Sequence, residues 1–177
     1  MHVYISDSDY LELERAALAG KWEDAKRFLE TQDDGGRAAA EARVVTPYKM
    51  TALHIAAFKG HAGFVKNMVE FLSKIDKVDV LGMEDDRGFT VLDYVALNGR
   101  QEVAEALIET KRDLLNSSIS GQLKPSALSI AVLGTCFGNK SDSTRVLRYL
   151  ASAATDQNLL SEDLINALVL NGHLGEL

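Results

Sequence analysis

The segment 134–141, G-T-C-F-G-N-K-S, comes closest to a chemical motif, because it ends in the G-x-K-S of a phosphate-binding loop. A P-loop has four residues between its glycines, carries its lysine directly after the second glycine and follows a strand. Here three residues separate the glycines, Asn139 precedes Lys140, and the apolar run before the segment has a helical pattern. We interpret 136–143 as an insertion loop between two helices and expect no cofactor.

The histidines and the single cysteine offer two further kinds of chemistry. His54 and His61 have no carboxylate or third ligand at useful spacing, so no metal site is expected. Both histidines are instead predicted to have structural roles, and His61 is predicted to begin a helix. Cys136 can form no disulfide within the chain, and no adjacent histidine or basic pair activates its thiol; lipidation and redox sensing stay open as alternatives. No catalytic residue is predicted, and the chain is not expected to be an enzyme.

Composition excludes several classes of partner. The chain has 177 residues, 46% of them hydrophobic and 25% charged, with a formal net charge of −7. Binding to nucleic acid needs clustered Lys and Arg, which this acidic chain lacks. The longest uncharged stretch, 125–139, is shorter than the roughly 20 apolar residues that cross a bilayer. We therefore expect a segment that binds neither nucleic acid nor membrane, and the single cysteine fits a reducing compartment such as the cytosol.

Short similar segments recur along the chain, and these elements would position any functional side chain. Residues 51–60 read T-A-L-H-I-A-A-F-K-G, and residues 90–99 read T-V-L-D-Y-V-A-L-N-G in the same register. Weaker copies give a set of anchoring positions at Leu13, Leu53, Leu92, Leu128 and Ile165. The predicted organisation is a leader at 1–9 and a repeat domain at 10–177, with repeats at about 10–45, 46–84, 85–120, 121–158 and a partial repeat at 159–177.

Each repeat is predicted to be a pair of antiparallel helices. The second helices carry apolar residues at i, i+3 and i+4, a spacing typical of a buried helix face. A glycine after each first helix suits a turn with positive φ. Segments such as 85–89, D-D-R-G-F, suit turns that project sideways from the stack. Because one pair cannot cover its own apolar face, neighbouring pairs must stack, and an all-α solenoid results.

These motifs resemble the ankyrin repeats. The most typical copy is T-A-L-H-I-A-A-F-K-G-H followed by F-V-K-N-M-V, and 85–93 supplies a second D-x-x-G-x-T-x-L entry. Three positions depart from the pattern: Lys49 replaces a turn glycine, Asp93 replaces the usual histidine, and Ser126 replaces the threonine. The resemblance implies a module that holds another protein.

A narrower resemblance covers nearly the whole chain and is to the plant ankyrin-repeat membrane proteins of the accelerated-cell-death and PGG-domain type. It is carried by A-A-L-A-G-K-W-E-D-A-K-R-F-L-E, G-H-A-G-F-V-K-N-M-V, V-A-L-N-G-R-Q-E-V-A-E-A-L-I-E-T-K-R-D-L-L, and Y-L-A-S-A-A-T-D with L-L-S-E-D-L-I-N-A-L. It implies a fragment of a membrane-anchored stress or defence signalling protein. The parent would lie at the plasma membrane or an endomembrane, with this segment facing the cytoplasm.

The family's variable surface positions predict where a protein partner binds. They lie in the projecting turns and at the ends of the first helices. Half of them are large apolar side chains, which is unusual for a surface that only contacts solvent. Mapped residue by residue onto this sequence, the predicted partner-binding set is Tyr48, Met50, Phe58, Lys59, Asp86, Arg87, Phe89, Leu97, Asn98 and Leu133.

The sequence thus favours a protein–protein interaction module of a plant signalling protein. Two alternatives remain: the gating or regulatory domain of an ankyrin-bearing channel or transporter, and the docking arm of an enzyme. A channel-type membrane segment or catalytic motifs beyond Leu177 would favour one or the other. The half-repeat at 159–177 predicts an uncovered apolar face, and with it self-association of the chain.

Overall fold

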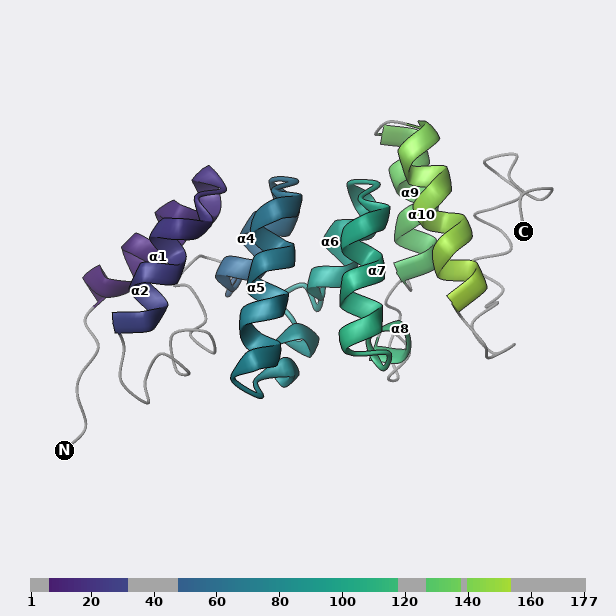
Figure 1. Ribbon diagram of the computed structural model, residues 1–177. Coiled ribbons are helices and arrows are strands. Elements are labelled where there is room, and N and C mark those ends of the chain that lie inside the picture. The colour runs from purple at the N-terminus through teal and green to yellow at the C-terminus, as the bar shows by residue number, and fades with distance from the viewer. Residues whose placement is uncertain (1–6, 32–47, 118–126, 138–139, 154–177) are drawn as a thin grey trace.

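The computed structural model describes residues 7–31, 48–117, 127–137 and 140–153, which form a row of helix pairs (Figure 1). No strand occurs in these ranges, and the predicted all-α ankyrin-type solenoid is confirmed. The partial repeat and the self-association expected from it lie outside the described residues. The described elements are α1 (Asp7–Ala19), α2 (Trp22–Thr31), α4 (Ala52–Phe58), α5 (Ala62–Lys74), η1 (Val78–Gly82), α6 (Val91–Leu97), α7 (Gln101–Thr110), α8 (Leu114–Ser117), α9 (Ala127–Phe137) and α10 (Lys140–Ala153).

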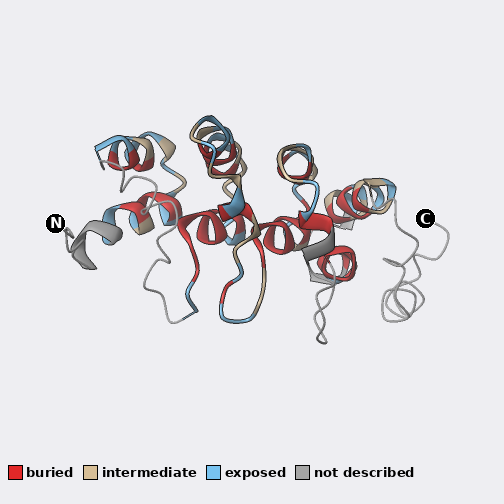
Figure 2. Cartoon of the chain, turned by 90° about the horizontal axis from the view of Figure 1, so that it is seen from below, coloured by how far each residue is buried: buried red, intermediate tan, exposed pale blue. Residues whose placement is uncertain are grey.

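The helices form two parallel rows. The inner row consists of α1, α4, α6 and α9, and the outer row of α2, α5, α7 and α10; within each row every helix contacts the next. Figure 2 shows one row that is buried almost throughout and another whose far side is exposed. The predicted anchors of the inner row are indeed in the core, since Leu13, Leu53, Leu92 and Leu128 are at most 3% exposed.

Each of the first three inner helices ends in the same backbone turn. The glycine after it has a positive φ, 67° at Gly20, 77° at Gly60 and 67° at Gly99. A hydrogen bond then closes the helix end across the glycine, which is the pattern of a glycine-terminated helix. These bonds run from Lys21 N to Ala16 O, from His61 N to Ala56 O and from Arg100 N to Val95 O, at 2.9, 2.9 and 3.3 Å. The predicted glycine turns are therefore confirmed.

The fourth pair differs from the expectation drawn from the sequence. α9 continues through Cys136, and α10 begins soon afterwards, so the predicted insertion loop at 136–143 is wrong. Thr135 stands at the register position that Gly60 occupies in the second repeat. A β-branched residue rarely takes a positive φ, so the turn cannot form there and the helix runs on.

Gly134, the first glycine of the phosphate-loop-like segment, lies where α9 packs against α6. A Cβ atom on this residue would stand 2.7 Å from the carbonyl oxygen of Leu97 and 3.2 Å from that of Ala96. Only a residue without a side chain allows the two helices to approach this closely. The glycine therefore serves helix packing, and a helix rather than a loop holds it.

Candidate functional site

The projecting turn at 84–89 is held together by the buried carboxylate of Asp85. Its Oδ1 accepts hydrogen bonds from the backbone N–H groups of Arg87 and Phe89, at 2.8 and 2.9 Å. Gly88 has a φ of 78°, and its N–H donates to the Asp85 carbonyl at 2.9 Å. An aspartate commonly organises a turn in this way because its short side chain reaches the following N–H groups. The D-x-x-G pattern predicted this turn correctly.

Tyr94 joins the turn to α6 and gathers an aromatic cluster, defined here as His54, Phe58, Phe89 and Tyr94. The Tyr94 hydroxyl donates a hydrogen bond of 2.6 Å to Asp85 Oδ2. Its ring meets those of Phe58 and Phe89 edge-on with centroids 5.7 Å apart, and that of His54 at 6.0 Å. Burial, followed by the hydrogen bond to Asp85, raises the pKa of Tyr94 far above its usual value. The phenol is thus a permanent donor that fixes the turn.

His54 links the second repeat to the loop that follows it. Its Nδ1 lies 3.2 Å from Thr51 N and 2.7 Å from Thr51 Oγ1, and its Nε2 lies 3.0 Å from Met83 O. Because the Thr51 N–H donates to Nδ1, Nε2 carries the proton and donates to Met83 O. Burial lowers the pKa of His54, although the charge of Asp85 opposes part of that shift. The predicted structural role of this histidine is confirmed.

Asp93 takes the place of that histidine at the start of α6. Its Oδ2 accepts hydrogen bonds from Thr90 N and Thr90 Oγ1, at 2.7 and 3.0 Å. The carboxylate therefore caps the helix just as the imidazole caps α4.

Two successive turns are connected side by side. The N–H of Asp86 donates to the carbonyl of Tyr48 at 2.9 Å, and Lys49 Nζ pairs with Asp86 Oδ1 at 3.2 Å. Lys49 has a φ of 50°, which fits the turn glycine that it replaces. The guanidinium of Arg87 lies 4.3 Å from the centroid of the Tyr48 ring. These contacts hold exposed side chains of both turns in fixed positions.

The structure places nine of the ten predicted partner-binding residues at least partly on the surface. Met50 is the exception: it is 9% exposed and belongs to the hydrophobic core, so its prediction as a surface residue is corrected. It directly precedes the cap of α4, where the chain enters the stack. Phe89 and Leu97 are partly exposed, and the exposed members are Tyr48, Phe58, Lys59, Asp86, Arg87, Asn98 and Leu133.

Asn98 is exposed, but its amide is already used within the fold. Its Nδ2 lies 2.9 Å from Ala57 O, 3.2 Å from Phe58 O and 3.0 Å from Tyr94 O. The side chain thus ties the end of α6 to the end of α4. This contact gives Asn98 a role in joining repeats that its position in the sequence did not reveal.

Two exposed apolar residues of α1, Leu11 and Leu18, were missed in the sequence, and Leu18 shares its register with predicted ones. Leu18 is 42% exposed and stands in α1 at the register position of Phe58, two residues before the turn glycine. Leu97 and Leu133 take the same position in α6 and α9. We call these four side chains the apolar ladder: Leu18, Phe58, Leu97 and Leu133. The sequence did carry the signal, because the alignment of the repeats places all four in one column.

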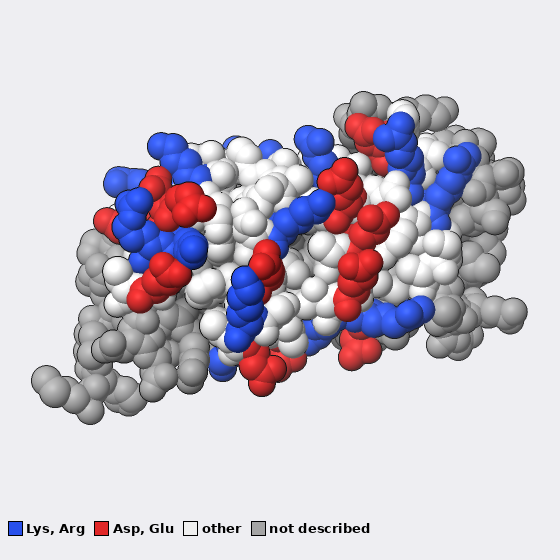
Figure 3. Space-filling view, viewed as in Figure 1, with Lys and Arg blue, Asp and Glu red and all other residues white. Residues whose placement is uncertain are grey.

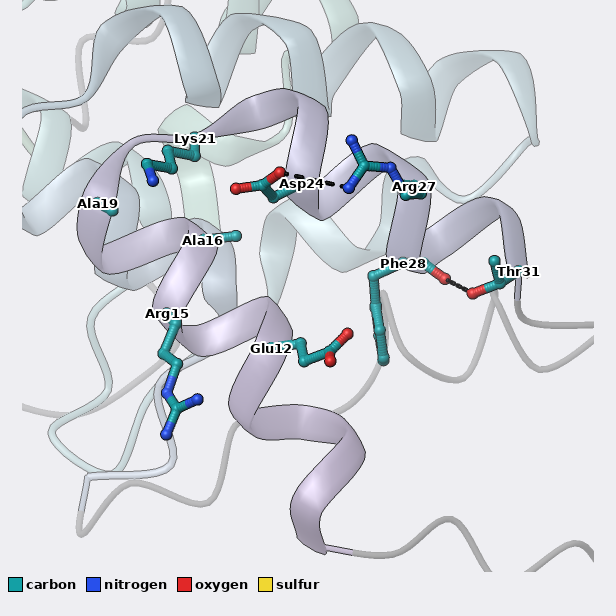
Figure 4. Close-up of a pocket in the computed structure, with 9 residues that line it drawn as sticks. All are labelled: Glu12, Arg15, Ala16, Ala19, Lys21, Asp24, Arg27, Phe28 and Thr31. Carbon is teal, nitrogen blue, oxygen red and sulfur yellow. Dashed lines mark hydrogen bonds and ion pairs between the residues drawn. The ribbon is translucent and has the colours of Figure 1, made fainter.

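The described surface also has a groove away from the inner face, and its lining indicates no particular ligand. The end of the stack formed by α1 and α2 has an open groove of about 480 Å³. Figure 4 shows that its polar side chains include Glu12 and Arg15, and Asp24 and Arg27, the latter two paired with each other at 3.7 Å. Within the described ranges, no group of three or more His, Cys, Asp or Glu residues is arranged to hold a metal ion.

The outer face, formed by the exposed sides of α5 and α7, has a different character. Figure 3 shows basic and acidic side chains alternating over it. Several of them are paired: Lys66 with Glu102 at 2.8 Å, Lys74 with Glu70 at 2.6 Å, and Lys111 with Asp79 at 2.8 Å. These pairs lower the pKa of each carboxylate through the hydrogen bond from its lysine.

Comparison with known proteins identifies the family to which this chain belongs. A family model of ankyrin repeats, in three copies, matches residues 13–118, more than half of the chain. A search of the curated proteins found no match. In the described part of the chain, no helix has both the length and the apolar character that crossing a membrane requires. Ankyrin repeats are typically binding modules for proteins rather than catalysts. With its paired helices, glycine turns and projecting turns, the chain belongs to the ankyrin repeat family.

Proposed function

We propose that the chain binds a protein partner through its inner face, which comprises the exposed side of the inner row and the turns at 48–49 and 84–89. The observation that carries this proposal is the apolar ladder. Phe58 is 50% exposed and Leu133 43%, and both lie in one column with Leu18. Large apolar side chains gathered on one surface mark contact sites for proteins, whereas isolated ones are ordinary.

The outer face supports the same assignment by contrast. Its lysines and carboxylates neutralise one another over short distances. Such a surface interacts well with water and offers little apolar area to a partner. We therefore place the binding site on the inner face and expect the outer face to remain in solvent.

Two matched double variants test this assignment. Phe58→Glu with Lys59→Glu changes the inner face, and Ser73→Glu with Lys74→Glu makes the same change in charge at exposed positions of α5. Each immobilised protein is used to capture partners from an extract of plant tissue, after circular dichroism has shown that both are folded. We expect the inner variant to lose proteins that the wild type and the outer variant retain. Equal capture by all three would overturn the proposal.

For the biological setting, we propose the cytosolic ankyrin part of a membrane-anchored plant protein that acts in stress or defence signalling. The support is the resemblance of the segments around Trp22, His61, Gly99 and Tyr149 to the accelerated-cell-death type. An antibody against this domain should detect a band larger than 19.3 kDa in plant membranes, soluble in detergent and resistant to alkaline extraction. A band of that size or smaller confined to the soluble fraction would contradict the setting.

A further inference from the structure

The apolar ladder has a regular spacing. Its members stand at the same register in α1, α4, α6 and α9, and these helices contact one another in that order. Packed helices have axes about 8–10 Å apart. Neighbouring side chains of the ladder are therefore separated by about the same distance, and four of them form a line across four repeats.

This spacing discriminates among the backbone conformations that a bound peptide can adopt. A polyproline II helix rises about 3.1 Å per residue with three residues per turn, so every third side chain returns to one face after about 9 Å. An α-helix presents side chains on one face at i, i+4 and i+7, after about 6 and 10.5 Å. A β-strand presents one face every second residue, at about 7 or 13 Å. The polyproline II period alone lies within the range of the helix spacing.

The charged side chains of the inner face indicate which charge a bound peptide would carry. Lys59 and Arg87 each lie over an aromatic ring and have no carboxylate partner within the described ranges. The nearby carboxylates are engaged: Asp85 accepts hydrogen bonds from its own turn and from α6, and Asp86 pairs with Lys49. Two exposed cations on the inner face, Lys59 next to Phe58 in the ladder and Arg87 in the projecting turn, favour a peptide with acidic residues between its apolar ones.

We propose that the inner face binds an acidic peptide in the polyproline II conformation, with an apolar residue at every third position. Four successive apolar side chains of the peptide contact Leu18, Phe58, Leu97 and Leu133, and its carboxylates approach Lys59 and Arg87. This inference rests on the proposed function of the inner face and specifies the chemistry of the partner.

Synthetic peptides test the inference directly. The probe is a fluorescent twelve-residue peptide with leucine at every third position and proline and glutamate between them. One control has the same composition in scrambled order, and the other has lysine in place of glutamate. In anisotropy titrations of the 177-residue chain, we expect the probe to bind at least about tenfold more tightly than either control. Equal binding of the probe and the scrambled peptide, or no binding of the probe, would overturn the inference.

Single substitutions in the protein locate the bound peptide. Leu18→Ser, Phe58→Ser and Leu133→Ser should each weaken binding of the probe by about tenfold, because each removes an apolar contact. Leu11→Ser is the matched control, since Leu11 is 44% exposed on the same helix as Leu18 but lies two turns away from the ladder. Weakening by Leu11→Ser alone, or by none of the four, would place the peptide elsewhere and contradict the inference.

The two proposals fail in different ways. The inference fails alone if the probe does not bind while Phe58→Glu with Lys59→Glu still removes a captured partner from the extract. In that case the inner face binds a partner of other chemistry. If that double variant captures the same proteins as the wild type, the proposed function fails as well.

Discussion

The outer and inner rows of helices are joined across neighbouring repeats by different kinds of contact. On the outer row, charged side chains such as Lys66 and Glu102 pair with each other across neighbouring repeats. On the inner row, neighbouring repeats are joined by hydrogen bonds to backbone carbonyls and by close backbone packing, as at Asn98 and Gly134. Exposed ion pairs contribute little to stability, whereas buried polar groups are costly to disrupt. The inner row should therefore tolerate fewer substitutions, although it also carries the exposed apolar side chains.

The largest effect is expected where a turn of the inner row meets the backbone of the next repeat. Gly60 and Gly99 have similar positive φ angles, so alanine at either position should cost about 1–2 kcal/mol in conformational strain. At Gly99, a Cβ would also stand 2.8 Å from the backbone nitrogen of Ser143, whereas at Gly60 it meets only the flexible Arg100 at 3.6 Å. Gly99→Ala should lose about 1–3 kcal/mol more than Gly60→Ala in urea unfolding. Equal losses would show that this contact can relax.

The next effect concerns the hydroxyl of Tyr94. Tyr94→Phe removes its donor to the buried Asp85 and should lower the free energy of unfolding by about 1.5–3 kcal/mol. Tyr149→Phe is the control from the outer row, because that hydroxyl has no hydrogen-bond partner in the described part of the chain. Urea unfolding of both variants measures the difference. A loss in Tyr149→Phe as large as that in Tyr94→Phe would remove the distinction between the rows.

A smaller effect should follow acidification. Because burial lowers the pKa of His54 below 6.5, the unfolded chain takes up a proton at a higher pH than the folded chain does. The stability that depends on neutral His54 is therefore complete above about pH 6.5 and is lost as the pH falls below that value. The thermal unfolding midpoint should decrease between about pH 7 and pH 5.5. In the His54→Gln variant, the part of this decrease that comes from His54 should be absent. If the variant and the wild type lose the same amount over this pH range, groups other than His54 cause the loss.

The smallest effect is expected on the outer face. Glu102→Gln removes the partner of Lys66, yet both side chains contact water, and salt screens their attraction. Thermal unfolding of this variant should match that of the wild type at moderate salt. A decrease comparable to that of Tyr94→Phe would reverse the comparison between the rows.

The features that follow from local conformation could be predicted from the sequence. A glycine is needed wherever the chain takes a positive φ, and this requirement revealed the turns at Gly60 and Gly99. Asp85 and Gly88 revealed the projecting turn for the same reason, because its hydrogen bonds lie within a few residues. Repetition of these local signals was enough to predict the stack and its all-α class.

The features that depend on neighbouring repeats could not be predicted in this way. The burial of Met50 and the use of the Asn98 amide are both set by the packing of one repeat on another. α9 extends to Phe137 because Thr135 stands where the first three repeats have a glycine, and this extension replaces the insertion loop predicted at 136–143. Leu18 was missed although the register of the repeats contains it, since the first repeat aligns only over its end.

The shared turn that closes α1, α4 and α6 makes the repeat an interchangeable unit. Because the chain leaves each of these helices through the same backbone geometry, an excision from 61 to 99 would join two equivalent points of the stack. The product would keep a continuous inner row with one side chain fewer in the apolar ladder. A peptide bound along that row would be shorter by one turn of its own backbone, so the number of repeats sets the length of sequence that such a protein can recognise.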